Sequence, residues 1–188
     1  MPLISRTRTR WLIVALALSA IAFSPVRAQS QELCEPDGNY ESPSETLRTV
    51  ELPELGVSVS IPENYRTMKL QNGAVQILHP DDFEWIQCVA NGGRGGGGYY
   101  FEMIQKVMPD PTLNLQEQAS RMMGSDIQIM AYQQNGLEGY IVNSVYGYNV
   151  AFLGTIPGYQ HLIEVSAGCD CEIEVEAVTD LLSEVRPL

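Results

Sequence analysis

Hydrophobic and polar positions alternate along much of the chain after residue 47, and this period of two predicts β-strands. Val57, Val59 and Ile61 alternate with serines, which is typical of a strand with one buried face. The same reasoning places further strands at residues 65–70, 74–78, 99–107, 127–132, 137–144, 148–153 and 161–167. Asn-Gly pairs at 72–73 and 135–136 each separate two of these segments, and this dipeptide readily adopts type I′ turns. Two antiparallel hairpins are therefore expected.

Two segments carry helix signals instead. Asn114 and Glu117 form a capping-box-like start for a short helix that Gly124 closes. A second helix is expected from about Ile173 to Val185, and Pro187 stops it. Most of the predicted elements are strands joined by short turns, and the few helices are separate from them along the chain. This order indicates an α+β domain built on an antiparallel sheet.

The segment that follows Pro80 fits two structures equally well. It could be a short helix with Phe83, Ile86 and Val89 facing inward. It could equally be a strand with Phe83, Trp85 and Gln87 on one side. Both alternatives stay open on the pattern alone.

The first 28 residues follow a different pattern. Three arginines precede an apolar run from Trp11 to Phe23, and Pro25 breaks that run. Ala28 then places a small residue at the expected cleavage point. This order is typical of a secretory signal peptide that is cleaved on export. The run would span about 20 Å as a helix, short of the roughly 30 Å of a bilayer core. A periplasmic or extracellular protein is therefore expected.

Three regions follow from this interpretation: a signal peptide over 1–28, a flexible polar arm over 29–47, and one α+β domain over 48–188. Residues 1–28 hold four of the eleven basic residues and none of the 23 acidic ones. Residues 29–188 therefore carry seven basic and 23 acidic side chains, a net charge of −16. Such an acidic surface excludes nucleic-acid binding, and it suits a basic protein partner or a divalent cation.

Four cysteines, Cys34, Cys88, Cys169 and Cys171, follow the expected cleavage point. An even number in an exported chain favours disulfides, and three pairings are possible. A bond between Cys169 and Cys171 would close a very small, strained ring. We therefore expect these two cysteines to pair with Cys34 and Cys88, in either order.

Acidic residues surround the second cysteine pair. Asp170, Glu172 and Glu174 are weak candidates for a cation site, although the dipole of the last helix already explains glutamates at its start. His79 with the two aspartates that follow Pro80 fits a turn and a helix cap better than a metal site.

The glycine-rich stretch over 92–98 contains the spacing GxGxxG. A dinucleotide site needs a strand before this motif and a helix after it, whereas here a strand follows. The sequence thus shows no cofactor motif and no catalytic constellation, which favours a non-catalytic role. Five side chains in or near turns are candidate partner contacts, because tyrosine and arginine are enriched at interfaces: Arg94, Tyr99, Tyr100, Tyr146 and Tyr148.

Four segments resemble the PsbP-like family, which is named for an extrinsic subunit of photosystem II: Gly56–Tyr65, Leu113–Ala119, Leu137–Ser144 and Leu181–Pro187. The resemblance implies a central antiparallel sheet with helices on both faces, an α/β/α sandwich. It also implies a non-catalytic accessory protein whose partner is unknown. The four cysteines and the glycine-rich stretch depart from that family. They keep open an alternative, a small extracytoplasmic redox or metal-handling protein that uses Cys169 and Cys171.

Overall fold

The computed structural model of the chain describes residues 33–34, 41–95, 99–145, 147–169 and 171–188. All of them belong to one unit, residues 31–188. The expected signal peptide lies outside the described residues, as do Tyr146 and Asp170.

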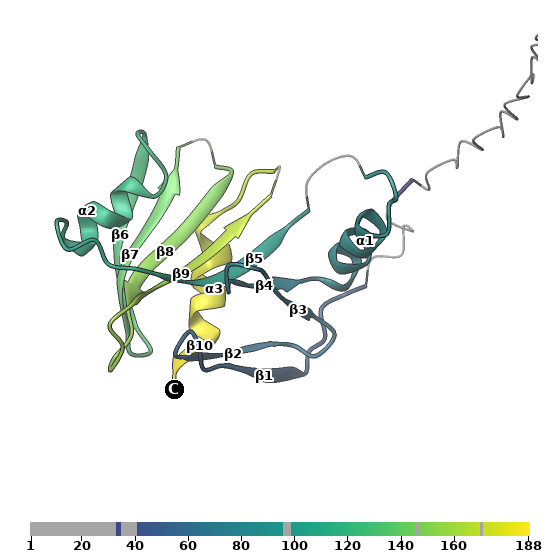
Figure 1. Ribbon diagram of the computed structural model, residues 1–188, viewed down its shortest axis with the longest axis horizontal. Helices are drawn as coiled ribbons and strands as arrows, with labels where there is room; N and C mark the ends of the chain where they lie inside the picture. Colours follow the sequence, from purple (N-terminus) through teal and green to yellow (C-terminus); the bar gives the residue numbers. More distant parts are fainter. Residues whose placement is uncertain (1–32, 35–40, 96–98, 146, 170) are drawn as a thin grey trace, which may run out of the picture. The chain divides into compact units, whose positions relative to one another are not determined.

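Seven strands form the larger of two sheets, in the spatial order β3-β4-β5-β9-β8-β7-β6 (Figure 1). Their bounds are Arg66–Lys69 (β3), Val75–Leu78 (β4), Phe101–Val107 (β5), Ile127–Gln134 (β6), Leu137–Ser144 (β7), Asn149–Thr155 (β8) and Leu162–Gly168 (β9). Every neighbouring pair is antiparallel. The strands predicted over these residues are confirmed, with small shifts of their ends.

Three further strands form a smaller antiparallel sheet in the order β1-β2-β10: Leu47–Leu52 (β1), Val57–Pro62 (β2) and Val185–Pro187 (β10). The sequence predicted only β2. The predicted last helix is confirmed over Val175–Glu184, and it ends one residue earlier than expected because Val185 pairs with β2 instead. Residues before β1 also make contacts, since Ser44 N donates to Asn64 Oδ1 at 2.9 Å.

Three helices complete the described fold: Pro80–Ala90 (α1), Leu115–Arg121 (α2) and Val175–Glu184 (α3). The segment after Pro80 is thus a helix, begun by proline at its first turn and by a His79 side chain that accepts from Asp81 N. Val89 does not face inward as that alternative had it, since 37% of its surface is exposed. The capping box that starts α2 is confirmed, with both bonds between Asn114 and Glu117 present.

The two Asn-Gly hairpins form with different turns. Asn135 and Gly136 both have positive φ angles, 55° and 82°, and lie directly between the paired residues Gln134 and Leu137, as a type I′ turn requires. In the other hairpin only Gly73 has a positive φ, 87°, and Leu70 N donates to Ala74 O at 2.8 Å. That loop therefore has three residues, so the predicted hairpin is confirmed but its predicted type I′ turn is wrong.

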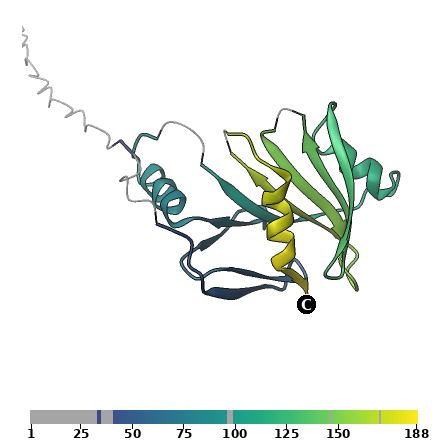
Figure 2. The ribbon, with the colours of Figure 1, turned by 180° about the vertical axis from the view of Figure 1, so that it is seen from behind.

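The two faces of the larger sheet are covered differently. On one face, here called the closed face, side chains of Ile104, Phe152 and Val165 pack with α3 and with β2 in the main core. On the opposite, open face, α2 packs on β7 and β8, where Ala119 lies against Val142 and Leu153 in a smaller core. Figure 2 shows α3 in front of the sheet and α2 on the far side.

A pair of glycines shapes the closed face. Gly139 and Gly154 lie opposite each other on β7 and β8. A β-carbon on either would overlap the ring of Phe152, which is fully buried and makes an edge contact with Tyr132 at 5.4 Å between ring centroids. The two glycines therefore provide the space that the largest buried side chain of the core occupies.

Candidate functional site

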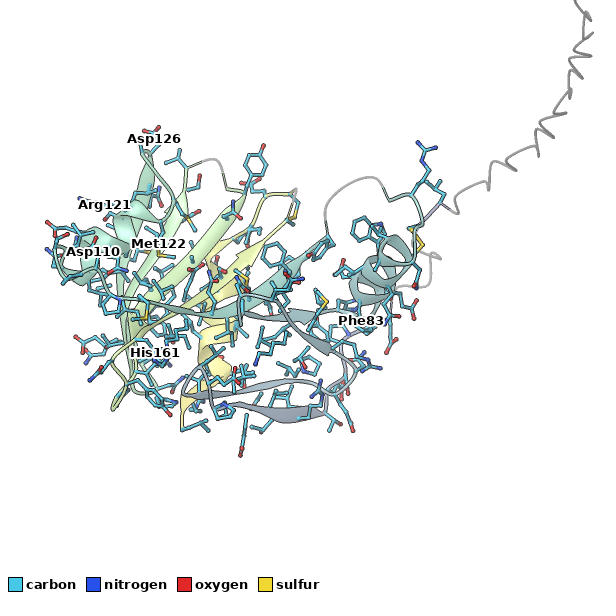
Figure 3. All side chains as sticks on the ribbon, viewed as in Figure 1. Phe83, Asp110, Arg121, Met122, Asp126 and His161 are labelled. Atoms are coloured by element: carbon cyan, nitrogen blue, oxygen red, sulfur yellow. A yellow bond between two sulfur atoms is a disulfide. The ribbon has the colours of Figure 1, made fainter. Side chains whose placement is uncertain are left out.

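A groove of about 300 Å³ lies on the open face, beside the part of the sheet that α2 covers. Its apolar lining comes from β5 and from the end of α2: Phe101, Met103, Met122 and Met123 (Met122 is labelled in Figure 3). Its polar lining comes from β7, β8 and β9: Ser144, Asn149, Glu164 and Ser166. The four apolar side chains are only half-buried, so their surface is available to a ligand.

Strand register brings these residues together. Met103 of β5 lies opposite Ser166 of β9, and Gln105 lies opposite Glu164. Because side chains alternate between the faces of a strand, these residues share the open face. Met122 caps the C-terminal end of α2, whose position Ala119 fixes in the smaller core. The groove therefore has one wall from a helix end and a floor from the sheet.

Glu164 is the one charged side chain among the described residues that line the groove. Gln105 Nε2 donates to Glu164 Oε2 at 2.8 Å. Burial raises the pKa of Glu164 above its ordinary value, against the smaller lowering effect of hydrogen bonds from Gln105 and Ser166. A partly desolvated carboxylate without a cationic partner gains from an incoming positive charge.

This arrangement suits a long side chain with a positive end. Lysine and arginine lay their aliphatic stems along apolar surface while the head reaches a polar partner. Methionine side chains adapt to different ligand shapes, because they are unbranched and flexible. The groove thus offers apolar contact from Met103, Met122 and Met123, and a carboxylate for the head of such a side chain.

A second glutamate lies across the sheet, on the closed face. The Tyr100 hydroxyl donates to Glu102 Oε1 at 3.2 Å. The pKa of Glu102 is raised to about 7, and burial is the main cause. The bond from Tyr100 opposes this rise, and the negative charge of Asp180 on α3 adds a smaller contribution to it. This carboxyl therefore lies on the face of the sheet that the main core covers, and it does not line the groove.

The candidate partner contacts fall into two groups. Tyr99 is half-buried, with its ring 5.6 Å from Trp85 and 5.7 Å from Phe101 between centroids, and Tyr100 is committed to Glu102. Arg94 is exposed, and 54% of the surface of Tyr148 is exposed. Tyr146 lies outside the described residues. Among the described candidates, Arg94 and Tyr148 are therefore the fully exposed ones, while Tyr99 and Tyr100 keep part of their surface.

The expected disulfide pairing is wrong. Cys34 bonds to Cys88, and Cys169 bonds to Cys171. Helix α1 carries Cys88 to the segment around Cys34, where Cys34 N donates to Arg94 O at 2.8 Å. A β-carbon on Gly93 would overlap both sulfurs, so this glycine of the glycine-rich stretch packs on the bridge. Cys169 and Cys171 follow β9, and they bond to each other despite their small ring.

The acidic candidates near α3 are exposed. Glu174 stands at the N-cap position of α3 without a side-chain capping bond, Glu172 precedes it, and Asp170 lies outside the described residues. Within residues 33–34 and the described ranges from 41 onward, no group of three or more His, Cys, Asp and Glu side chains could hold a metal ion.

The other two motifs serve local structure. His79 Nδ1 accepts from Asp81 N at 3.3 Å, so that cluster caps α1 as expected. The glycine-rich stretch follows helix α1 and precedes strand β5, the reverse of the order in a dinucleotide site.

Sequence reasoning missed the groove. Its signal was available in β9, where Glu164 and Ser166 interrupt an otherwise apolar strand, and in β5, where Phe101 and Met103 alternate with polar residues. These patterns show which residues share a face, but they do not show that a helix leaves that face uncovered.

Comparisons with solved structures find a weak likeness. No family model and no curated protein matches the chain. The solution structure of cyanobacterial PsbP (CyanoP) from Synechocystis sp. PCC 6803 is similar over 80% of this chain and 96% of that chain, with 14% sequence identity and a TM-score of 0.45. The expected PsbP-like resemblance is thus confirmed as a weak one, and the functional argument rests on this chain's own residues.

No helix in the described part of the chain is long and apolar enough to cross a membrane.

Proposed function

We propose that the chain is an exported accessory protein that binds a basic segment of a partner protein in the open-face groove, and that this groove binds without catalysis. The observation that carries this proposal is Glu164, a partly buried carboxyl bounded by apolar side chains and bonded to the neutral Gln105. A lysine or arginine of the partner would supply the missing positive charge.

The charge of the whole chain supports a basic partner. Residues 29–188 carry a net charge of −16, which attracts positively charged surfaces over distances of about a Debye length, roughly 8–10 Å in physiological salt. Such a field accelerates encounter and rejects acidic partners, while the groove fixes the register of the bound segment.

The proposal includes the export of the chain. Residues 1–28 would be the cleaved signal peptide, 29–47 an N-terminal arm that is flexible except where Cys34 and the contacts before β1 hold it, and 48–188 the domain, located in the periplasm or outside the cell. Protein purified from its natural host should begin at Gln29. An intact mass that retains residues 1–28 would contradict the export.

The finer fold assignment is also part of the proposal. We infer a PsbP-like sandwich with helices on both faces of the central sheet. The packing of α2 on one face and of α3 on the other supports it.

Calorimetric titration with two matched peptides tests the binding. Acetyl-Leu-Lys-Leu-amide should bind to the purified chain, and acetyl-Leu-Glu-Leu-amide should not. Glu164→Gln should weaken the lysine peptide about fivefold, roughly 1 kcal/mol for a partly buried charge pair. Glu172→Gln, an exposed glutamate outside the groove, is the control and should leave the affinity unchanged.

The pH dependence sharpens the test. Because the lysine needs an ionised carboxylate, affinity should rise as pH increases through the raised pKa of Glu164, and this rise should vanish in Glu164→Gln. Equal binding of both peptides, or an unchanged affinity in Glu164→Gln, would contradict the proposed function.

A further inference from the structure

We propose that the Cys169–Cys171 disulfide is a thiol–disulfide exchange site that accepts electrons from a protein dithiol. This inference does not rest on the proposed binding function, because the disulfide is not among the residues that line the groove. It rests on the contrast with the other bridge and on the surroundings of the two sulfurs.

The two bridges differ in burial and in span. Cys34 is 6% exposed and Cys88 is half-buried, and their bond joins positions 54 residues apart. Cys171 is exposed, Cys169 is half-buried, and only two positions separate them. A cross-link stabilises a fold mainly by restricting the unfolded chain, and this effect falls with the length of the closed loop. The Cys169–Cys171 bond therefore contributes little to stability, while its small ring and exposure favour reduction.

The hydrogen bonding of the pair assigns different roles to the two sulfurs. Cys171 N donates to Cys169 Sγ at 3.1 Å. A backbone N–H directed at a sulfur stabilises the thiolate form, so Cys169 is the better leaving group. Cys171, the exposed member, is the sulfur that an incoming thiolate can reach.

Exchange then proceeds in two steps. A thiolate of the partner dithiol attacks Cys171 Sγ, the bond to Cys169 breaks, and Cys169 leaves with the electron pair as a thiolate that takes up a proton. The second partner thiol, after losing its proton, attacks the mixed disulfide and releases Cys171 as a thiolate, which is protonated. The partner dithiol is oxidised to a disulfide, and the Cys169–Cys171 pair is reduced to two thiols.

The charges around the pair restrict the partner. Glu172 and Glu174 are exposed and follow the disulfide directly in the chain. Together with the negative charge of the chain they repel acidic thiols, so exchange should be faster with a neutral or cationic thiol than with an anionic one of similar reactivity.

Graded reduction of the native chain tests the inference. The purified protein is equilibrated with increasing dithiothreitol, alkylated, and mapped by mass spectrometry. The peptide with Cys169 and Cys171 should be alkylated at a reductant concentration at least about tenfold lower than Cys34 and Cys88 require. Simultaneous reduction of both bridges, or earlier reduction of Cys34–Cys88, would overturn the proposal.

A second measurement separates exchange from a structural role. The double variant Cys169→Ser with Cys171→Ser should keep the melting temperature of the oxidised chain within a few degrees, because the bond closes so short a loop. Failure of this variant to fold, or a large fall in its melting temperature, would show that the bridge is structural and would contradict the inference.

The choice of small thiol completes the test. Cysteamine, which is cationic, should reduce the pair faster than mercaptopropionate, which is anionic, after each rate is divided by the rate of the same thiol with an uncharged small disulfide. Added salt should reduce the remaining difference. Equal normalised rates at low salt would contradict the assigned role of Glu172 and Glu174.

Discussion

The two faces of the larger sheet differ in what covers them, and each holds one glutamate on the neighbouring strands β5 and β9. On the closed face Glu102 lies among core residues, bonded to Tyr100 and close to the negative Asp180. On the open face Glu164 lies in a groove, with the neutral Gln105 and Ser166 as its partners. Burial raises the pKa of both carboxyls. Glu164 lines the groove, whereas Glu102 does not. We therefore assign stability to the closed face and propose recognition for the open face.

The largest expected difference between the faces is in core packing. Phe152→Ala on the closed face should reduce the free energy of unfolding by about 3–5 kcal/mol, because it leaves a cavity above Gly139 and Gly154. Met103→Ala in the groove should cost less than about 1.5 kcal/mol, because its side chain is only half-buried. Urea unfolding of the two variants measures both values. Equal losses would show that the open face is as much a part of the core as the closed face.

The next effect is a pH dependence of stability that Glu102 sets. Its pKa is raised from 4.5 in the unfolded chain to about 7, so between these values the folded protein binds more protons than the unfolded one. The contribution of Glu102 to the free energy of unfolding is therefore fully present below about pH 4.5 and is lost as pH rises through about 7. At 1.36 kcal/mol per pH unit the loss is up to about 3 kcal/mol.

Glu102→Gln tests that assignment, because it keeps the shape of the side chain without the titration. The variant should lose less stability between pH 4.5 and pH 8 than the unchanged protein in urea unfolding. Asp180→Asn should also reduce the loss of stability over this pH range, by a smaller amount, because the charge of Asp180 is a minor cause of the raised pKa of Glu102. Identical pH profiles for Glu102→Gln and the unchanged protein would contradict the role of this carboxyl.

The smallest predicted change concerns the helix beside the groove. Asn114→Ala removes the side chain that starts α2 and should cost about 1 kcal/mol. Because Met122 and Met123 come directly after α2 in the chain, the variant should also weaken the binding of the lysine peptide. The pH dependence of stability that Glu102 sets should stay the same. A variant that loses stability but binds the peptide normally would separate the groove from the position of α2.

Local patterns predicted much of the fold. Alternation gave the strand positions and the capping box marked the start of α2, because both signals arise from neighbouring residues. Strand β10 was missed since Val185–Pro187 is short and pairs with the distant β2. The pairing of Cys34 with Cys88 depends on the position that α1 gives to Cys88, which local sequence does not show. The small ring of the Cys169–Cys171 bond does not prevent that bond from forming.

The patterns of β5 and β9 show which of their residues share a face, but they do not show that these residues form a groove. Glu164 and Met103 meet only through the register of β5 with β9, and their exposure depends on α2 covering β7 and β8 instead. Neither relation leaves a trace in the local spacing of residues.

The most direct test of the account observes the methionine methyl groups by NMR while the lysine peptide is added. Met103, Met122 and Met123 line the groove, whereas Met68, Met108 and Met130 are outside it and serve as internal controls. The account predicts saturable shifts of the first three methyl signals, unchanged signals for the controls, and loss of the shifts in Glu164→Gln. Shifts confined to Met68, Met108 or Met130, or no shifts at saturating peptide, would contradict the claim that the open face is the recognition face.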